Sequence, residues 1–363
     1  MRIVILGHSI TSSWGNSHAV VYRCLARELS ELGHEVLFLE RELPQHAKKR
    51  DMPSPPSCRA CLYGSVAELK KKYFDDIRTA DCVIVGSYVP EGAKVGELIT
   101  SAARGVTVFY DLDAPVTLAR LNEGRCGYLN RKLIRNYSIY MSSTSGPILE
   151  RFEREFGSPM ARPLYCPADP ENYYPEAVTD RRIWDMGYMG TYSPDRWKPL
   201  EELMLKTARK LKTRTFVVAG PQYPEDITWP VNLQRLEYLP QDMHRRFYNS
   251  QRFTLNITRA DMKKAGYSPP GRLFEAAACG TPIVSDLWEG LSEIFEPGRE
   301  ILISRSAEET MDYLLYTPER ERVKLGIRAR ERVLGSHTAA HRAKELENYI
   351  REASGATRLP KAG

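Results

Sequence analysis

The residues best suited to bind an anionic ligand lie in residues 266–286, with the sequence GYSPPGRLFEAAACGTPIVSD. Ser268 and the two prolines after it can cap and begin a helix, the alanines can continue it, and Gly280 can end it before a β-branched strand. The N-terminus of such a helix attracts a phosphate, and Arg272 in the first turn adds a charged donor. Glu275 follows on nearly the same face, where its carboxylate can accept hydrogen bonds from the hydroxyls of a ribose.

Taken alone, this pattern fits equally well a surface helix with an Arg–Glu pair three residues apart. A resemblance favours the ligand-binding interpretation. Residues 266–303 are similar to the donor-site signature of GT-B glycosyltransferases, closest to the CgeB-like (spore maturation protein B-like) group. The resemblance implies that Glu275 holds the ribose of a sugar nucleotide and that the preceding residues, including Tyr267 and Ser268, line the diphosphate and the sugar. Many retaining relatives carry a second glutamate where this chain has Tyr267, so the donor sugar and the stereochemical course are not carried over.

A second candidate loop is residues 187–196, GYMGTYSPDR, at the end of another predicted strand. A glycine there lets the backbone approach a phosphate, and a nearby arginine can neutralise its charge. The resemblance places the diphosphate at this loop, at Gly190, Thr191 and Tyr192, with Arg196 as the cation. The alternative is a plain turn with a surface arginine, because Ser, Pro and Asp are ordinary turn residues.

Two further segments follow strands of the same half of the chain. Arg259 comes directly after one strand and is expected to face the ligand, although a salt bridge to Asp261 is a competing role. Residues 238–244, YLPQDMH, resemble the loop that receives the nucleobase through backbone groups, which makes Leu239 and Pro240 candidates. As a bare sequence this segment is a turn and a helix start.

In the first half of the chain, residues 12–18, SSWGNSH, join the first strand to its helix. Trp14, Gly15 and Asn16 are predicted to line the acceptor side. The G-x-G-x-x-G dinucleotide fingerprint is absent, which weakens an NAD-binding interpretation. His18 would stand at the helix start, where an imidazole of ordinary pKa ~6.5 can act as base on an acceptor hydroxyl. A structural histidine is the alternative.

Residues 110–115, YDLDAP, end another first-half strand with two carboxylates. The two-residue period of a strand can place Asp111 and Asp113 on one side, where either could be the base or an acceptor ligand. The alternative is Asp113 as the N-cap of a helix in which Pro115 is an early residue.

A metal site is not expected. No DxD-like pair is placed to bridge a diphosphate, and the CxxC of Cys58 and Cys61 lacks a second CxxC or paired histidines. Helix N-termini and arginines can stabilise the leaving group instead. Seven cysteines, an odd number at scattered positions, do not form the disulfide framework of a small secreted domain, so most are expected to be buried thiols.

The elements that position these residues alternate as strand and helix along the chain. Apolar runs at 2–6, 36–40, 82–86, 106–110 and 138–141, with helical patterns between them, predict a doubly wound α/β domain. A Pro- and Tyr-rich stretch follows at 159–182, and then a second series of strands begins at 183. The predicted architecture is GT-B, with two Rossmann-like domains facing across a cleft. The predicted parts are an acceptor-side domain at 1–165, a linker at 166–182, a donor-side domain at 183–335, and at 336–363 a helix that can pack back on the first domain, with a tail.

Composition agrees with two globular domains. The 363 residues are 42% hydrophobic and 27% charged, with 24 Gly and 24 Pro, which excludes collagen-like and broadly disordered classes. Lys and Arg number 52 against 46 Asp and Glu, and because they are interleaved, nucleic acid is not indicated as a partner. No run approaches the ~18 apolar residues of a membrane helix, and the N-terminus does not resemble a signal peptide. A cytoplasmic location is therefore expected.

The sequence thus predicts a metal-independent glycosyltransferase without a cofactor. Its donor would be a nucleoside-diphosphate-sugar, with a UDP-sugar as the default, and its acceptor a glycan, protein or small molecule. A nucleotide-sugar epimerase and a non-catalytic nucleotide-sugar-binding protein are the alternatives, with an NAD-dependent oxidoreductase a distant fourth. The sequence leaves the oligomeric state open.

Overall fold

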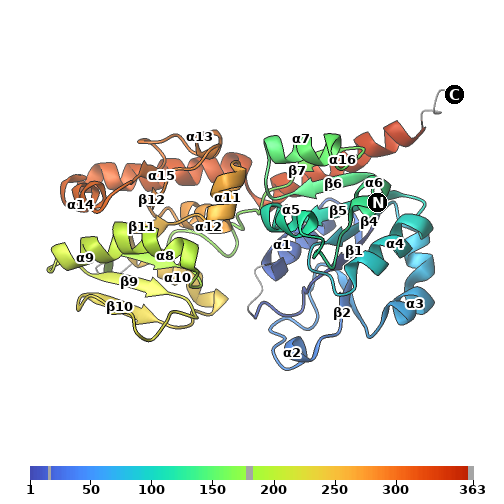
Figure 1. Cartoon of the computed structure of the whole chain (residues 1–363), viewed down its shortest axis with the longest axis horizontal. Helices are drawn as coiled ribbons and strands as arrows, with labels where there is room; N and C mark the ends of the chain where they lie inside the picture. Colours follow the sequence, from blue (N-terminus) through green and yellow to red (C-terminus); the bar gives the residue numbers. More distant parts are fainter. Residues whose placement is uncertain (15–17, 177–182, 359–363) are drawn as a thin grey trace. The chain divides into compact units, whose positions relative to one another are not determined.

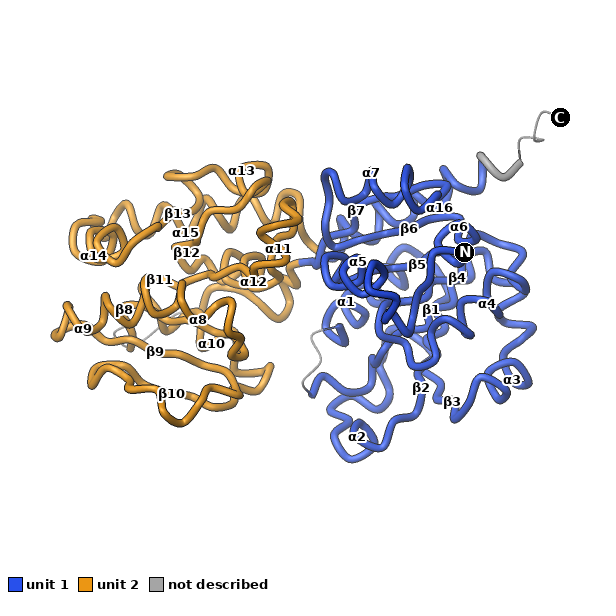
Figure 2. The backbone as a smooth tube through the Cα atoms, viewed as in Figure 1, with its two compact units in different colours: residues 1–167, 339–363 blue, residues 168–338 orange. Residues whose placement is uncertain are grey.

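The computed structural model describes residues 1–14, 18–176 and 183–358 (Figure 1). The chain divides into two compact units, coloured separately in Figure 2: unit 1 is residues 1–167 with 339–363, and unit 2 is residues 168–338. Residues 168–176, which the sequence analysis placed in a linker, thus belong to unit 2, and residues 177–182 lie outside the described residues.

Unit 1 is built on a parallel sheet of seven strands in the order β3-β2-β1-β4-β5-β6-β7. The strands are β1 (Arg2–Gly7), β2 (Glu35–Arg41), β3 (Arg59–Tyr63), β4 (Cys82–Gly86), β5 (Val106–Asp111), β6 (Ile139–Ser142) and β7 (Ala161–Pro163). The helices are α1 (His18–Glu31), α2 (Pro44–Ala47), α3 (Val66–Thr79), α4 (Gly92–Ala102), α5 (Ala114–Asn122), α6 (Arg131–Asn136), α7 (Pro147–Arg154) and α16 (Ala339–Arg358). β1, β4 and β5 are near-continuous apolar runs because helices cover both faces of such a sheet.

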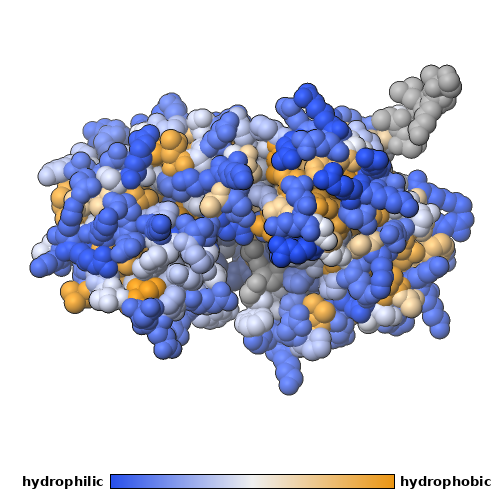
Figure 3. Space-filling view, in the orientation of Figure 1, coloured by the Kyte–Doolittle hydropathy of each residue, from blue (hydrophilic) through white to orange (hydrophobic). Residues whose placement is uncertain are grey.

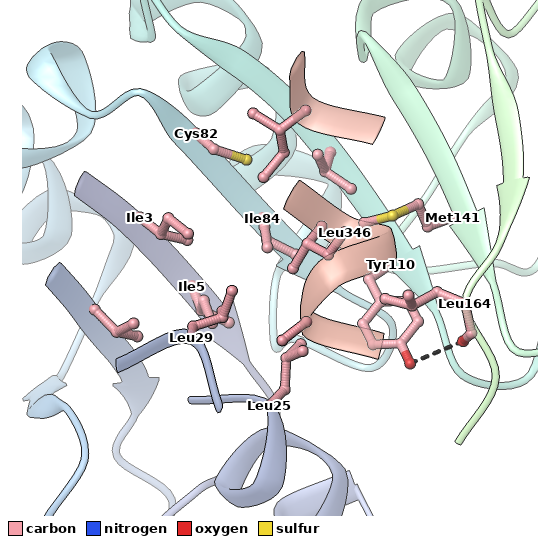
Figure 4. Close-up of a cluster of buried hydrophobic side chains, with 14 of the residues drawn as sticks. Ile3, Ile5, Leu25, Leu29, Cys82, Ile84, Tyr110, Met141, Leu164 and Leu346 are labelled. Carbon is pink, nitrogen blue, oxygen red and sulfur yellow. Dashed lines mark hydrogen bonds between the residues drawn. The ribbon is translucent and has the colours of Figure 1, made fainter. Parts of the chain in front are cut away.

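The core of unit 1 joins the first strands to the last helix. Figure 4 shows Ile5, Leu25 and Ile84 packed with Leu346, which comes from α16. Tyr110 reaches the same cluster, and its hydroxyl donates a hydrogen bond of 3.0 Å to the carbonyl oxygen of Leu164. The C-terminal helix therefore completes the core of unit 1.

Unit 2 repeats the architecture with six parallel strands in the order β10-β9-β8-β11-β12-β13. The strands are β8 (Trp184–Met189), β9 (Phe216–Ala219), β10 (Leu233–Leu236), β11 (Gln251–Asn256), β12 (Ile283–Ser285) and β13 (Leu302–Ile303). The helices are α8 (Pro194–Leu200), η1 (Glu201–Leu205), α9 (Lys206–Lys210), η2 (Gln241–Met243), α10 (His244–Asn249), α11 (Ala260–Ala265), α12 (Gly271–Ala278), α13 (Leu291–Ile294), α14 (Ala307–Tyr316) and α15 (Glu319–Ser336). Two doubly wound parallel sheets confirm the predicted fold class.

The parallel sheets decide where ligands can bind. Because all strands of a sheet point the same way, the loops after them gather at one edge, which is where open α/β sheets bind ligands. In unit 2 the N-terminus of α12 is at this edge, since α12 precedes β12 and runs antiparallel to it. No helix of the described residues has the length and apolar character of a membrane span. The face in Figure 3 is largely hydrophilic, with hydrophobic residues in small scattered groups.

Candidate functional site

Arg196, in the first turn of α8, lies at the carboxyl edge of unit 2. Its Nε donates to Ser193 Oγ at 2.9 Å, and its Nη2 donates to the carbonyl oxygen of Thr191. These bonds fold the guanidinium back over the loop after β8. Burial lowers the pKa of Arg196 from its ordinary value, and the positive charge of Arg272 lowers it further. Two predicted site residues from separate helices are therefore electrostatic neighbours.

Arg272, at the start of α12, is the second cation of this edge. Its Nη1 donates to the carbonyl oxygen of Ile257 at 3.0 Å, and its guanidinium carbon lies 5.6 Å from the ring centroid of Tyr188. Tyr188 is buried in β8, and its hydroxyl has no hydrogen-bond partner among the described residues. The positive charges of Arg196 and Arg272 repel each other, and an anion bound near both would relieve that repulsion. This pair is suited to a diphosphate.

Glycines bring the backbones of two edge loops together. A Cβ on Gly220, which follows β9 and has a φ of +137°, would lie 2.2 Å from the carbonyl oxygen of Gly190. A side chain at Gly190 itself would meet the hydroxyl of Tyr188 at 2.6 Å. Tyr223 closes the arrangement, because its hydroxyl donates to the carbonyl oxygen of Gly190 at 3.1 Å. Glycine is thus required at both positions by the close packing within unit 2, and the approach of Gly190 to a phosphate stays a prediction.

Glu275 lies one turn into α12 and is partly exposed. Its Oε2 accepts a hydrogen bond of 2.9 Å from the hydroxyl of Tyr248, a buried residue of α10. This bond fixes the carboxylate while leaving acceptor capacity on both of its oxygens. Burial, with the negative charge of Glu275 next in effect, raises the pKa of Tyr248 well above its ordinary value, so the tyrosine stays a donor. Sequence reasoning missed Tyr248, which is 27 residues away in the sequence and lies on a different helix.

The other predicted donor residues of unit 2 occupy the same edge. Arg259 ends the loop after β11, and its Nε lies 3.5 Å from Asp261 Oδ1, so the competing ion pair is present. Leu239 and Pro240 follow the outer strand β10, and Pro240 precedes η2. Tyr192 extends from the loop after β8, with its ring centroid 5.5 Å from that of Tyr223.

Ser268 does not cap α12, contrary to the expectation from its position. The N-cap residue is Pro270, with extended φ and ψ of −63° and 137°. A proline disfavours the helical conformation of the residue before it. Pro270 therefore keeps Pro269 from being the first helical residue. The helix therefore starts at Gly271, and the buried Ser268 lies outside it.

The carboxyl edge of unit 1 is organised around Tyr88, which follows β4. Its hydroxyl donates a hydrogen bond of 2.9 Å to Asp113 Oδ2, and its ring centroid lies 5.5 Å from that of His18. The Arg120 guanidinium carbon lies 5.3 Å from the same ring centroid. Tyr88 has a φ of +64°, a left-handed conformation that is costly for a bulky residue and that clusters at functional sites. His18 and Asp113 are thus brought to one tyrosine that sequence reasoning missed.

His18 begins α1, as predicted, and Asp113 is the N-cap residue of α5. The Asp113 side chain makes no capping hydrogen bond to the helix. Burial and the nearby His8 lower the pKa of His18 to about 4, so its imidazole is neutral at pH 7. A neutral imidazole can accept a proton, but with this pKa it is a weaker base than an ordinary histidine.

Asp111 is fully buried at the end of β5. Its Oδ2 accepts from the Tyr140 hydroxyl at 2.6 Å, and its Oδ1 accepts from the backbone N–H of Asp113 at 2.9 Å. Burial raises its pKa to about 6. These contacts give Asp111 a structural role in holding the loop that carries Asp113.

Trp14 is 43% exposed, and Lys49 Nζ lies 3.2 Å from its ring centroid. Gly15 and Asn16 lie outside the described residues. The seven cysteines are free thiols, including Cys58 and Cys61. Among the residues of the described ranges, no group of three or more His, Cys, Asp or Glu side chains is arranged to hold a metal ion.

Residues 196–348 match a family described as glycosyl transferase-like. None of the curated proteins matches the sequence. Sucrose-phosphate synthase from Thermosynechococcus elongatus superposes with a TM-score of 0.70 at 13% identity, covering 98% of this chain and 100% of that one.

Two further solved structures share the fold. The Anabaena protein HepE, in complex with UDP and glucose, has a TM-score of 0.70 at 12% identity, covering 97% of this chain and 100% of its own. An α-glucosyltransferase in complex with UDP-glucose and DNA containing an abasic site has a TM-score of 0.70 at 16% identity, covering 97% and 99%. Residues 196–348 are therefore similar to a glycosyl transferase-like family, and the chain shares the GT-B fold of these solved structures.

Proposed function

We propose that this protein moves a sugar from a nucleoside-diphosphate-sugar to an acceptor hydroxyl without a metal ion, and that unit 2 binds the donor. The observation that carries the proposal is the placement of Arg196 on the loop after β8 and of Arg272 beside Tyr188 of that strand, with Glu275 one turn further along α12. The cations suit a diphosphate, and the carboxylate suits the hydroxyl pair of a ribose. A UDP-sugar is the first choice of donor, because HepE and the α-glucosyltransferase were each solved with UDP or UDP-glucose.

The proposed reaction separates charge. The bond between the anomeric carbon and the diphosphate oxygen breaks, and a bond forms from that carbon to the acceptor oxygen. The sugar becomes cation-like and the leaving diphosphate becomes anionic in the transition state. Arg196 and Arg272 stabilise the leaving group, while the acceptor hydroxyl loses its proton to a base. We propose Asp113, oriented by Tyr88, or His18 as that base on unit 1.

Several finer assignments rest on the sequence. The resemblance of residues 266–303 supports membership of the CgeB-like group. The acceptor is proposed to be a glycan, a protein or a small molecule, and a cytoplasmic location stays a prediction.

Thermal unfolding with UDP, GDP, dTDP and NAD tests the donor proposal. A nucleoside diphosphate at 100 times its Kd should stabilise the chain by about 2.7 kcal/mol, whereas a response to NAD alone would contradict the proposal. Glu275→Ala should weaken binding of the preferred nucleotide by about 10- to 100-fold, the cost of lost hydrogen bonds to a charged group. Glu225→Ala, an exposed glutamate after β9, is the matched control and should leave the affinity unchanged. Conversion of the sugar nucleotide to an epimer without any acceptor would favour the epimerase alternative.

A further inference from the structure

A chain of hydrogen bonds runs from Arg196 to the first residue of α11. The Nε of Arg196 donates to Ser193 Oγ at 2.9 Å, and the hydroxyl of Ser193 donates to Asp195 Oδ1. The other carboxylate oxygen of Asp195 accepts a hydrogen bond of 2.7 Å from the backbone N–H of Ala260. Asp195 therefore joins the loop after β8 to the loop after β11. Sequence reasoning treated Ser193 and Asp195 as ordinary turn residues.

The hydroxyl of Ser193 serves this chain of bonds and not the helix. Ser193 is the N-cap residue of α8, where a serine ordinarily accepts a hydrogen bond from a backbone N–H two or three residues further on. Its side chain makes no such capping bond. The hydroxyl proton points to Asp195, which leaves the lone pairs of the oxygen to accept from Arg196. Loss of this hydroxyl would therefore remove a contact of Arg196 without removing a helix cap.

Asp195 can act only as an acceptor in this arrangement. Burial acts to raise the pKa of its carboxyl, but the hydrogen bonds from Ser193 and from the backbone of Ala260 outweigh burial, so the pKa lies below its ordinary value. The side chain is therefore ionised at pH 7. An ionised carboxylate has no proton to donate, so it fixes the direction of the bond from Ser193.

The helix at the far end of the chain of bonds is itself held in place. Lys263 of α11 donates a hydrogen bond of 3.1 Å to Asp286, which is buried directly after β12. Beyond α11, the N–H of Tyr267 donates a hydrogen bond of 2.6 Å to the carbonyl oxygen of Glu289, also after β12. Asp195 thus bonds to a backbone N–H whose helix is tied to the neighbouring edge segment.

We propose that Ser193 and Asp195 are positioning residues that hold the guanidinium of Arg196 in place for the diphosphate of the donor. This inference rests on the proposed function, in which Arg196 stabilises the leaving diphosphate. An arginine side chain has several rotatable bonds, and fixing them before the ligand arrives removes part of the entropy cost of binding.

The positioning effect of Asp195 opposes its direct charge effect. Removing Asp195 takes a negative charge away from an anionic ligand, and by Coulomb's law alone this would strengthen binding of the diphosphate. Weaker binding after the removal would therefore report the loss of positioning. The sign of the change separates the two effects.

Paired affinities of the full chain for UDP and uridine test the inference, by isothermal titration for UDP and ligand-observed NMR for uridine. Asp195→Ala and Ser193→Ala should each raise the Kd of UDP about tenfold and leave that of uridine unchanged, because uridine carries no phosphate. Ser193→Thr keeps the hydroxyl and should restore the affinity of the parent chain. Asp312→Ala, which removes an exposed aspartate of α14 outside this chain of bonds, is the matched control and should change neither affinity.

A double-mutant cycle with Arg196→Ala adds a readout that a purely structural role would not move. In the Arg196→Ala background, Asp195→Ala should not weaken UDP binding further, because no guanidinium is left to position. A further tenfold loss in that background would show that Asp195 acts independently of Arg196 and would contradict the inference.

The remaining outcomes separate this inference from the proposed function. If Arg196→Ala weakens UDP binding while Asp195→Ala and Ser193→Ala bind UDP as tightly as the parent chain or more tightly, the donor proposal stands and the positioning role is overturned. Equal losses of UDP and uridine affinity would show a general disturbance of unit 2 and would also contradict the positioning role. If UDP does not bind the parent chain, the proposal of a UDP-sugar donor fails, and the positioning role fails with it.

Discussion

Replacing Asp111 by Asn should remove a pH-dependent cost to the stability of unit 1. The carboxyl is fully buried, and its pKa is raised from 3.8 to about 6. A raised carboxyl pKa means that the fold favours the protonated acid. The stabilising contribution of protonated Asp111 is therefore fully present below pH 3.8 and is lost as pH rises through 6. A shift of roughly two pKa units corresponds to about 3 kcal/mol.

The measurable quantity is the free energy of unfolding of the variant minus that of the parent chain. We expect this difference to rise by about 2–3 kcal/mol between pH 4 and pH 7.5, because only the parent carries the ionising group. Urea unfolding followed by circular dichroism would measure it, with hydrogen exchange in β5 assigning the transition of unit 1. Asp75→Asn, at an exposed position of α3, is the matched control and should give a nearly constant difference. A constant difference for Asp111→Asn as well would refute the reasoning from burial.

Two further substitutions test the edges of the two sheets. Tyr88→Phe removes the 2.9 Å hydrogen bond to Asp113. Turnover should therefore fall about tenfold with the KM of the donor unchanged, and the pH profile of kcat should shift. An unaltered pH profile would argue against the role of Tyr88 in positioning Asp113. Gly220→Ala places a Cβ 2.2 Å from the carbonyl oxygen of Gly190, so thermal unfolding should show a loss of about 2–3 kcal/mol. Gly298→Ala, at a φ of +80° with open space around it, should cost only about 1 kcal/mol, and equal losses would contradict the steric argument.

The strand and helix order could be predicted because it depends on local patterns. Apolar runs separated by helical periodicity specify parallel strands, and parallel strands bring their following loops to one edge. That is why the loop with Arg196 and the helix start with Arg272 could be expected at one edge, whereas their assignment to a diphosphate came from the resemblance.

The contacts that fix side chains could not be predicted, since they join residues from different elements. The hydrogen bond from Tyr88 to Asp113 joins the segments that follow the neighbouring strands β4 and β5, and the bond from Tyr248 to Glu275 joins two helices. No local sequence motif marks Tyr88 or Tyr248 as the partner of a carboxylate. The period of β5 likewise could not show that Asp111 is fully buried, because burial depends on side chains of other elements, such as Tyr140 of β6.

A crystal structure with UDP bound would show whether unit 2 holds the donor. We predict the two ribose hydroxyls within hydrogen-bond distance of the Glu275 carboxylate and the diphosphate between the guanidinium groups of Arg196 and Arg272. UDP bound elsewhere on the chain, with Glu275 contacting only Tyr248 and the two arginines unoccupied, would contradict it.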